Sequence, residues 1–305
     1  MSVDSQRQLH ERLARFNVQR LRPALPDAHW RATLASECES RLLEGEFVEE
    51  GRRALAGLDV PDDADAFMRW YEDLCHTGPG QGDALFPFLA RRATLEQMRW
   101  FLVQEIAGEA GFDDLVALTQ LRVPERAKLE LARNYWDEMG RGHAKGMHGP
   151  MLAVVAEELA LVPAIETTVW ESLALANLMA ALAANRRYAW HAIGALGVIE
   201  MTAPGRVAQV NAGLRRLGVS PRGRRYFQLH AGLDIKHSAA WNREIIQPLV
   251  AADPQLARPI AEGALLRLSA GARCFARYRA HLHLAVPQRR RSRDQSMYPS
   301  NWSVA

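Results

Sequence analysis

The chain has 305 residues, of which 48% are hydrophobic and 24% charged, and its formal net charge at pH 7 is +3. This length can bury a large core, and the small, dispersed charge argues against a nucleic-acid partner. The three cysteines, Cys38, Cys75 and Cys274, are odd in number and far apart in the sequence. This pattern favours a reducing compartment over a framework of disulfides.

The chain is expected to be cytoplasmic, with no membrane partner. Its first residues are polar and lack the apolar run of a signal peptide. The most apolar long stretch, residues 173–201, is interrupted by Asn185, Arg186, Arg187 and His191. Polar and charged side chains at those positions predict a buried helix and not a membrane span.

Apolar residues recur with a helical period along almost the whole chain, and no strand-like alternation stands out. Proline and glycine mark the predicted ends of the helices, for example at Pro204 and Gly205. Helices are predicted at residues 5–18, 27–56, 63–77, 93–120, 125–142, 150–159, 165–201, 205–217, 221–248 and 254–284. The sequence therefore predicts an all-α protein.

We expect a single domain in three parts. Residues 1–90 are predicted to form an N-terminal helical cap packed on a helical bundle, which itself takes residues 91–285. Residues 286–305 contain a run of arginines after a proline and are predicted to form a flexible basic tail.

Candidate metal ligands first appear in the predicted helices 93–120 and 125–142. Glu105 and Glu109 lie one turn apart on one face of the first helix. If the chain turns back between the two helices, Glu138 of the second helix faces this region across an antiparallel pair. Its neighbour Asp137 is expected to point away.

His148 follows Glu138 by ten residues, after the glycines at positions 140, 142 and 146. A regular helix would not bring the two side chains together. We therefore expect His148 to reach Glu138 through a distorted or unwound turn, a device that occurs at functional sites.

Glu200 is the only polar residue in the run 194–201. A carboxylate in such a run is costly to bury unless it is paired or binds a metal. An outward-facing Glu200 directed toward Arg206 is the alternative.

His230, Asp234 and His237 have the spacing i, i+4, i+7. At about 100° per residue, the three side chains fall within about 60° of one another on one helical stripe. Two imidazoles and a carboxylate on one stripe form a ligand set for iron, manganese or zinc. A helix that merely carries two polar histidines is the alternative, but the preceding acids and His148 favour a metal site.

The order of these residues resembles the heme-oxygenase-like diiron oxidases and oxygenases, a family of iron-containing redox enzymes. The resemblance covers roughly residues 90–250. It runs through a first-helix glutamate, a second glutamate with a later histidine, a lone glutamate and the pattern His-x-x-x-Asp-x-x-His. The matching residues are Glu105 (or Glu109), Glu138, His148, Glu200, His230, Asp234 and His237.

The resemblance implies a heme-oxygenase-like helical bundle that holds two iron ions and uses O2 as a co-substrate. It implies that one iron is held by Glu138, His148 and His237. The other iron would be held by Glu200, His230 and Asp234, and Glu105 would be an extra ligand.

The glutamate in the first helix resembles the members that oxygenate amine nitrogen, so the expected substrate is a small amine or amino-acid derivative. Oxidative C–C cleavage or desaturation of an aliphatic acid is the alternative chemistry. A metal-free hydrolase or a binding module is the alternative class, and the residues do not separate iron from manganese. An external electron donor and a homodimer are further expectations.

Three residues, Arg187, Tyr188 and Trp190, are expected to contact the substrate. Arginine pairs with carboxylates through two parallel hydrogen bonds, so Arg187 is a candidate carboxylate clamp. Tyr188 and Trp190 are expected to wall the pocket. An ion pair between helices is the alternative role for this arginine.

Overall fold

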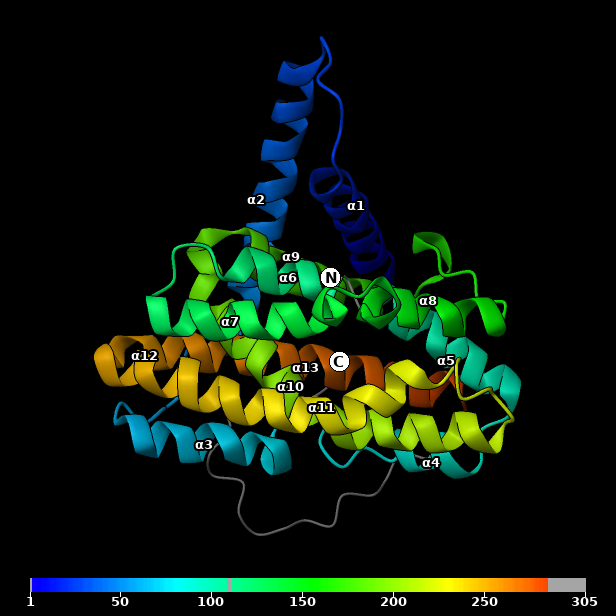
Figure 1. Ribbon diagram of the computed structural model, residues 1–305. Coiled ribbons are helices and arrows are strands. Elements are labelled where there is room, and N and C mark those ends of the chain that lie inside the picture. Colours follow the sequence, from blue (N-terminus) through cyan, green and yellow to red (C-terminus); the bar gives the residue numbers. More distant parts are fainter. Residues whose placement is uncertain (1, 109–110, 285–305) are drawn as a thin grey trace.

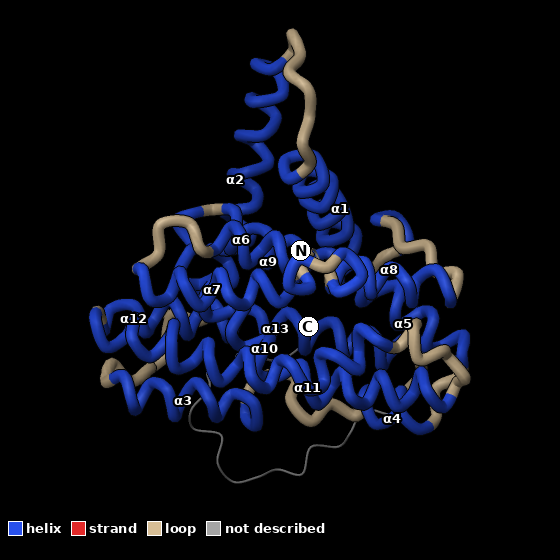
Figure 2. The backbone as a smooth tube through the Cα atoms, viewed as in Figure 1, coloured by secondary structure: helices blue, strands red, loops and turns tan. Residues whose placement is uncertain are grey.

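The computed structural model describes residues 2–108 and 111–284, and these residues form helices joined by short connections (Figures 1 and 2). No strand occurs in these two ranges, which confirms the all-α prediction. None of the helices in the described part is both long and apolar enough to cross a membrane. The helices are α1 (Val3–Leu21), α2 (Trp30–Ala54), α3 (Ala64–Thr77), α4 (Leu85–Arg91), α5 (Leu95–Gly108), α6 (Phe112–Thr119), α7 (Glu125–Glu138), α8 (His148–Glu158), α9 (Trp170–Ala184), α10 (Ala189–Arg216), α11 (Arg225–Trp241), α12 (Gln247–Ala252) and α13 (Ala257–His281).

Helix α10 is the centre of the bundle. It packs most extensively on α11 and α13, and also on α4 (Figure 1). Two glycines allow α10 and α13 to approach closely. A Cβ atom on Gly194 would lie 1.9 Å from the carbonyl oxygen of Ile260, and one on Gly263 would lie 1.9 Å from that of His191. Because only glycine lacks a Cβ atom, these two positions set the spacing of the helix pair.

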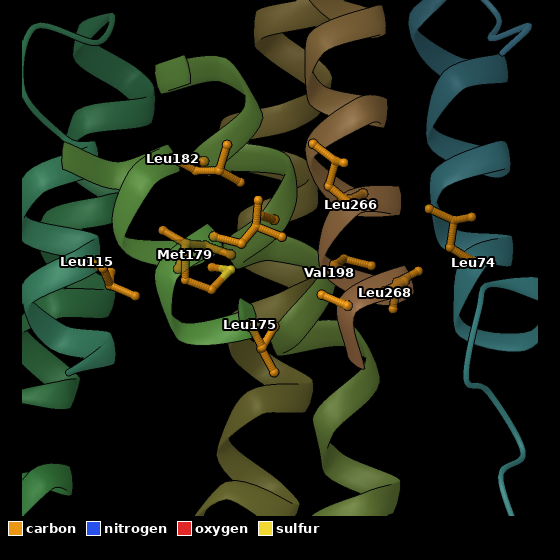
Figure 3. Close-up of a cluster of buried hydrophobic side chains, with 14 of the residues drawn as sticks. Leu74, Leu115, Leu175, Met179, Leu182, Val198, Leu266 and Leu268 are labelled. Atoms are coloured by element: carbon orange, nitrogen blue, oxygen red, sulfur yellow. The ribbon is translucent and has the colours of Figure 1, made fainter. Parts of the chain in front are cut away.

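The apolar core lies between these helices and their neighbours α3, α6 and α9. Figure 3 shows one part of it, in which leucine, valine and methionine side chains from different helices face one another. The residues labelled there are Leu74, Leu115, Leu175, Met179, Leu182, Val198, Leu266 and Leu268. Burial of this surface is the main favourable term in folding, and it fixes how the helices that carry polar ligands are oriented.

The predicted helix break at Pro204 is wrong, because α10 continues through this proline to Arg216. Proline has no N–H group, so the hydrogen bond to the carbonyl of Glu200 is lost. The extensive packing of α10 on both α11 and α13 compensates for that loss. The single predicted helix 165–201 is instead divided, because the chain leaves α9 at Asn185 before α10 begins.

Other boundaries also differ from the sequence-based prediction. The predicted helix 93–120 is two helices, α5 and α6, and Gly111 before α6 has a φ of 66°. Helix α4 was not predicted. The predicted helix 221–248 contains a π-helical segment, Asn242–Ile246, between α11 and α12. A π-helical turn is difficult to predict because it has no distinct apolar period.

The first ninety residues contact the bundle in different places. Helix α1 packs on α9, and the side chain of Asn17 donates a hydrogen bond of 2.9 Å to Asn177. Helices α3 and α4 instead lie at the opposite side, against α12 and α10 (Figure 1). The division of the domain at residue 90 stays a prediction. The predicted tail, 286–305, lies outside the described residues.

Candidate metal centre

The chain reverses sharply after Glu138, the last residue of α7. Gly140, Arg141 and Gly142 all have positive φ values, of 61°, 54° and 81°. A Cβ atom on Gly140 would lie 2.2 Å from the carbonyl carbon of Gly146, so the two sides of the turn touch. Glycine is needed where the backbone approaches itself this closely in a left-handed conformation.

This reversal places His148, the first residue of α8, beside Glu138. The imidazole Nδ1 atom lies 2.5 Å from the Oε2 atom of Glu138, and both side chains are buried. The predicted helix 125–142 therefore ends four residues early, at Glu138. The expected route of His148 to Glu138 through an unwound turn is what the structure shows.

Glu200 points into the bundle from α10. Its side chain is buried, and its Oε1 atom accepts a hydrogen bond of 2.7 Å from the amide of Asn134. The residue as a whole is only 2% exposed, which excludes the outward-facing alternative. Asn134 lies one turn before Glu138 in α7, so one helix holds both a ligand candidate and the group that orients Glu200.

The stripe His230, Asp234 and His237 is buried along α11. The Nδ1 atom of His230 lies 2.8 Å from the carbonyl oxygen of Tyr226. An N–H group at Nδ1 would donate to this oxygen and leave Nε2 available as a metal ligand, a common arrangement in metal sites. The Nδ1 atom of His237 lies 3.4 Å from the Oε1 atom of Glu200.

Two groups of side chains could each hold a metal ion, and they share Glu138. In each group, one ligand atom per residue lies within 4.8 Å of the ligand atoms of the other two. The first group is Glu138, His148 and His230, and the second is Glu138, Glu200 and His237. The two histidines of α11 are thus grouped in the opposite way to the expected partition. Asp234 belongs to neither group, but it lines the adjoining cavity with Glu138, Glu200 and His230.

Burial and charge give the members of this cluster different protonation. Burial lowers the pKa of His148 and of His230 to about 4, so both imidazoles are neutral at pH 7. Burial and the nearby charge of Glu200 raise the pKa of Glu138 to about 9. Burial also acts to lower the pKa of His237, but the carboxylates of Glu200 and Asp137 prevail and raise it to about 9.

The residues fit a metal ion. Oxygen and imidazole nitrogen ligands of this kind suit iron, manganese and zinc. The Nδ1 atoms of His148 and His237 are buried and have no hydrogen-bond partner among the described residues, although each lies close to a carboxylate oxygen. A metal cation between each Nδ1 atom and its nearby carboxylate oxygen would be bound by both atoms. It would also replace the proton on His237.

A family model of iron-containing redox enzymes matches residues 99–272, which is more than half of the chain. The chain belongs to this family. The matched segment contains both groups of candidate ligands and is part of the heme-oxygenase-like superfamily. Comparison with curated proteins found no matching relative.

In this member of the family, a cavity of about 120 Å³ adjoins the cluster. It extends between α5, α10, α11 and α13, and its wall is mostly apolar. Glu105 lines this cavity but belongs to neither group of converging ligands. The Oη atom of Tyr278 donates a hydrogen bond of 2.9 Å to Glu105. Glu109, the other candidate, lies outside the described residues.

The structure places the predicted substrate contacts away from this cavity. Arg187 and Tyr188 both donate to the carboxylate of Glu49, at 3.2 Å and 2.9 Å. Trp190 lies ten residues before Glu200 in α10, which is about 15 Å along the helix axis. None of the three residues lines this cavity. Arg187 forms the ion pair that was given as its alternative role, and a substrate contact at these residues stays a prediction.

Asp137 is a residue whose role the sequence analysis missed. Contrary to expectation, its Oδ2 atom lies 3.2 Å from the Nε2 atom of His237. It also accepts a hydrogen bond of 2.6 Å from Arg141 in the reversing turn. A carboxylate on the second nitrogen of a metal-binding histidine fixes the orientation of the ring. The position of Asp137 next to Glu138 was the one sequence signal for such a role. Adjacent side chains of a helix point about 100° apart, so helical phase alone directed Asp137 away from the site.

We expect the variant Asp137→Asn to bind Fe(II) about 10- to 100-fold more weakly than the parent, since it loses the charged partner of His237. Competition with a chelator under anaerobic conditions measures this affinity. Arg141→Gln is the matched control, because it removes the exposed partner of the same carboxylate. It should change the affinity little. Equal affinities of Asp137→Asn and the parent would contradict the orienting role.

Proposed function

We propose that this chain is a non-heme diiron, O2-dependent oxygenase that oxidises the nitrogen of a small amine or amino-acid derivative. The observation that carries the proposal is the pair of ligand groups that share Glu138. His148 and His230 would complete one iron site, and Glu200 and His237 would complete the other. A reduced iron pair, when bound, supplies electrons for the activation of O2.

The protein residues support this chemistry by holding the ligands and excluding water. Asn134 orients Glu200, Asp137 orients His237, and the carbonyl of Tyr226 orients His230. The cavity beside them is lined largely by phenylalanine and aliphatic side chains. An apolar wall keeps water away from the ligands and strengthens electrostatic interactions inside.

The choice of an amine rests on Glu105. Its position in the first core helix resembles the amine-oxygenating members of the family, and it lines the same cavity as Glu200 and His230. A protonated amine would be attracted to this acidic surrounding. An external electron donor would be needed for repeated turnover.

The test is anaerobic loading with Fe(II), followed by exposure to isotopically labelled O2 with a panel of linear amines and amino carboxylates. We expect two irons per chain and products that carry label on nitrogen. Products that are shortened or unsaturated and carry no label would favour C–C cleavage or desaturation. A chain that retains no metal after loading would favour a metal-free hydrolase or a binding module. Parallel loading with Mn(II) separates the two metals by their O2-dependent turnover.

A further inference from the structure

A second hollow lies close to the cavity of the metal cluster. It is an open groove of about 400 Å³ between the C-terminal half of α1, the connection that precedes α9, and α9 itself. Ile106 of α5 lines this groove, and it also lines the cavity beside the cluster. At Ile106 the wall between the two spaces is therefore one residue thick.

The two spaces differ in size. The cavity beside the cluster measures about 120 Å³. Ligand sites for small molecules commonly measure roughly 300–1,000 Å³, so this cavity alone is small and the groove falls within the usual range. A substrate that fills a site of ordinary size must extend beyond the inner cavity, and the groove adjoins that cavity at Ile106.

The wall of the groove is formed mainly by aliphatic side chains. They come from α1, from the connection before α9 and from α9, and they include Ala14, Val18, Leu21, Pro163, Ile165 and Leu173. Val18 and Leu21 are 59% and 42% exposed, so the folded chain leaves part of this apolar surface uncovered. A ligand that removed the surface from water would gain the free energy of apolar burial.

The polar side chains in the groove are already bound to other protein groups. Asn17 donates a hydrogen bond to Asn177, and Asn177 donates one to the carbonyl oxygen of His10. The hydroxyl of Thr168 donates to the carbonyl oxygen of Ala164. One acceptor in this wall, the Oδ1 atom of Asn17, has no hydrogen-bond partner among the described residues. The groove therefore offers a ligand mainly apolar contact.

Part of the groove is built by residues outside the segment that matches the family. Helix α1 supplies Ala14, Val18 and Leu21, and it ends far before residue 99, where the match begins. The ligand of the groove is therefore a property of this chain that the family match does not specify.

We propose that the groove binds the apolar tail of the substrate, and that the substrate is a primary amine on an unbranched alkyl chain. The amine lies at the metal cluster, the alkyl chain passes Ile106, and its end lies against Val18 and Leu21. The side chain of Ile106 changes rotamer to admit the chain. The amine end rests on the proposed function, whereas the apolar subsite does not.

Binding to the metal-free, full-length chain tests the subsite without any turnover. Calorimetry with n-alkylamines of four to twelve carbons, and with n-alkanols of the same lengths, gives the dissociation constants. We expect each methylene group that enters the groove to strengthen binding about 2- to 4-fold, because it leaves water for an apolar wall. The two series should depend on length in the same way, since the tail is bound independently of the head group.

Val18→Asp places a charge in the groove and should weaken the binding of dodecylamine about 10-fold or more. Butylamine, which needs only the inner cavity, should bind as it does to the parent. Val18 is 59% exposed, so this variant should fold normally, and thermal melting without ligand checks this. Leu42→Asp is the matched control, because Leu42 is 70% exposed and does not line the groove. It should bind both amines as the parent does.

Competition between the two amines tests whether the groove and the cavity form one site. If the alkyl chain spans both, one dodecylamine binds per chain and butylamine displaces it. Simultaneous binding of the two amines would show that the spaces are separate and would overturn the proposal.

Three further results would overturn the subsite. They are an affinity that does not depend on chain length, equal binding of dodecylamine to Val18→Asp and the parent, and a dimer that Val18→Asp dissociates. The last result, seen by light scattering, would assign the groove to a second copy of the chain.

The proposed function fails separately. A chain that binds dodecylamine through the groove but oxidises no amine after iron loading would leave the subsite intact and refute the amine oxygenase. Oxidation of butylamine and dodecylamine with equal kcat/KM would contradict the subsite and leave the oxygenase in place.

Discussion

Replacing Glu138 with alanine is expected to abolish the loading of both irons and all O2-dependent turnover. Glu138 is the one residue that belongs to both groups of converging ligands. Its removal leaves His148 and His230 without a carboxylate in one group, and Glu200 and His237 alone in the other. Because metal affinity falls steeply when a ligand is lost, we expect less than about 10% of the iron content of the parent.

Iron content is measured after anaerobic Fe(II) loading and removal of unbound metal. Glu125→Ala is the matched control, because Glu125 is an exposed residue at the first turn of the same helix. It should load iron as the parent does. Glu138→Gln preserves the size of the side chain, so a folded but iron-free variant separates ligand loss from unfolding. Normal iron content in both Glu138 variants would refute the shared-ligand arrangement.

Gly194→Ala is expected to lower the free energy of unfolding by about 3 kcal/mol or more. The added methyl group would lie 1.9 Å from the carbonyl oxygen of Ile260 in α13. A backbone atom cannot move aside by changing a rotamer, so α10 and α13 would have to separate. That separation would open the buried interface on both sides of the contact.

Chemical denaturation followed by circular dichroism gives the free energy of unfolding. Gly205→Ala in the same helix is the control, because a Cβ atom there would meet no atom within 4 Å. This substitution should be neutral or stabilising by up to about 1 kcal/mol, since alanine is the better helix former. If the two variants had equal stability, the close approach of α10 and α13 would not limit the packing.

The sequence carried much of the fold and part of the site. The apolar period predicted an all-helical chain, because each helix must bury one continuous stripe. The spacing of His230, Asp234 and His237 predicted that they share a stripe of one helix. The apolar run around Glu200 predicted a buried carboxylate. All these inferences depend only on helical phase and on the cost of burial, which are local properties of the chain.

Helical phase and the cost of burial did not predict which residues meet between helices. The left-handed turn after Glu138 brings His148 back to it, and the packing of α7 on α11 brings Asp137 to His237. Proline at position 204 marked a helix end in the sequence, yet α10 continues because its neighbours hold it in place.

The same distinction applies to Arg187. Arg187 lies just before α10, next to the apolar part of that helix, and this position made it a candidate substrate contact. The tertiary structure pairs Arg187 with Glu49, and the arginines that line the cavity are Arg206 and Arg267. Helical phase is fixed at about 100° per residue, and so it can be read from the sequence. The approach of two helices depends on the packing of every side chain between them, and only the folded chain decides which charges meet.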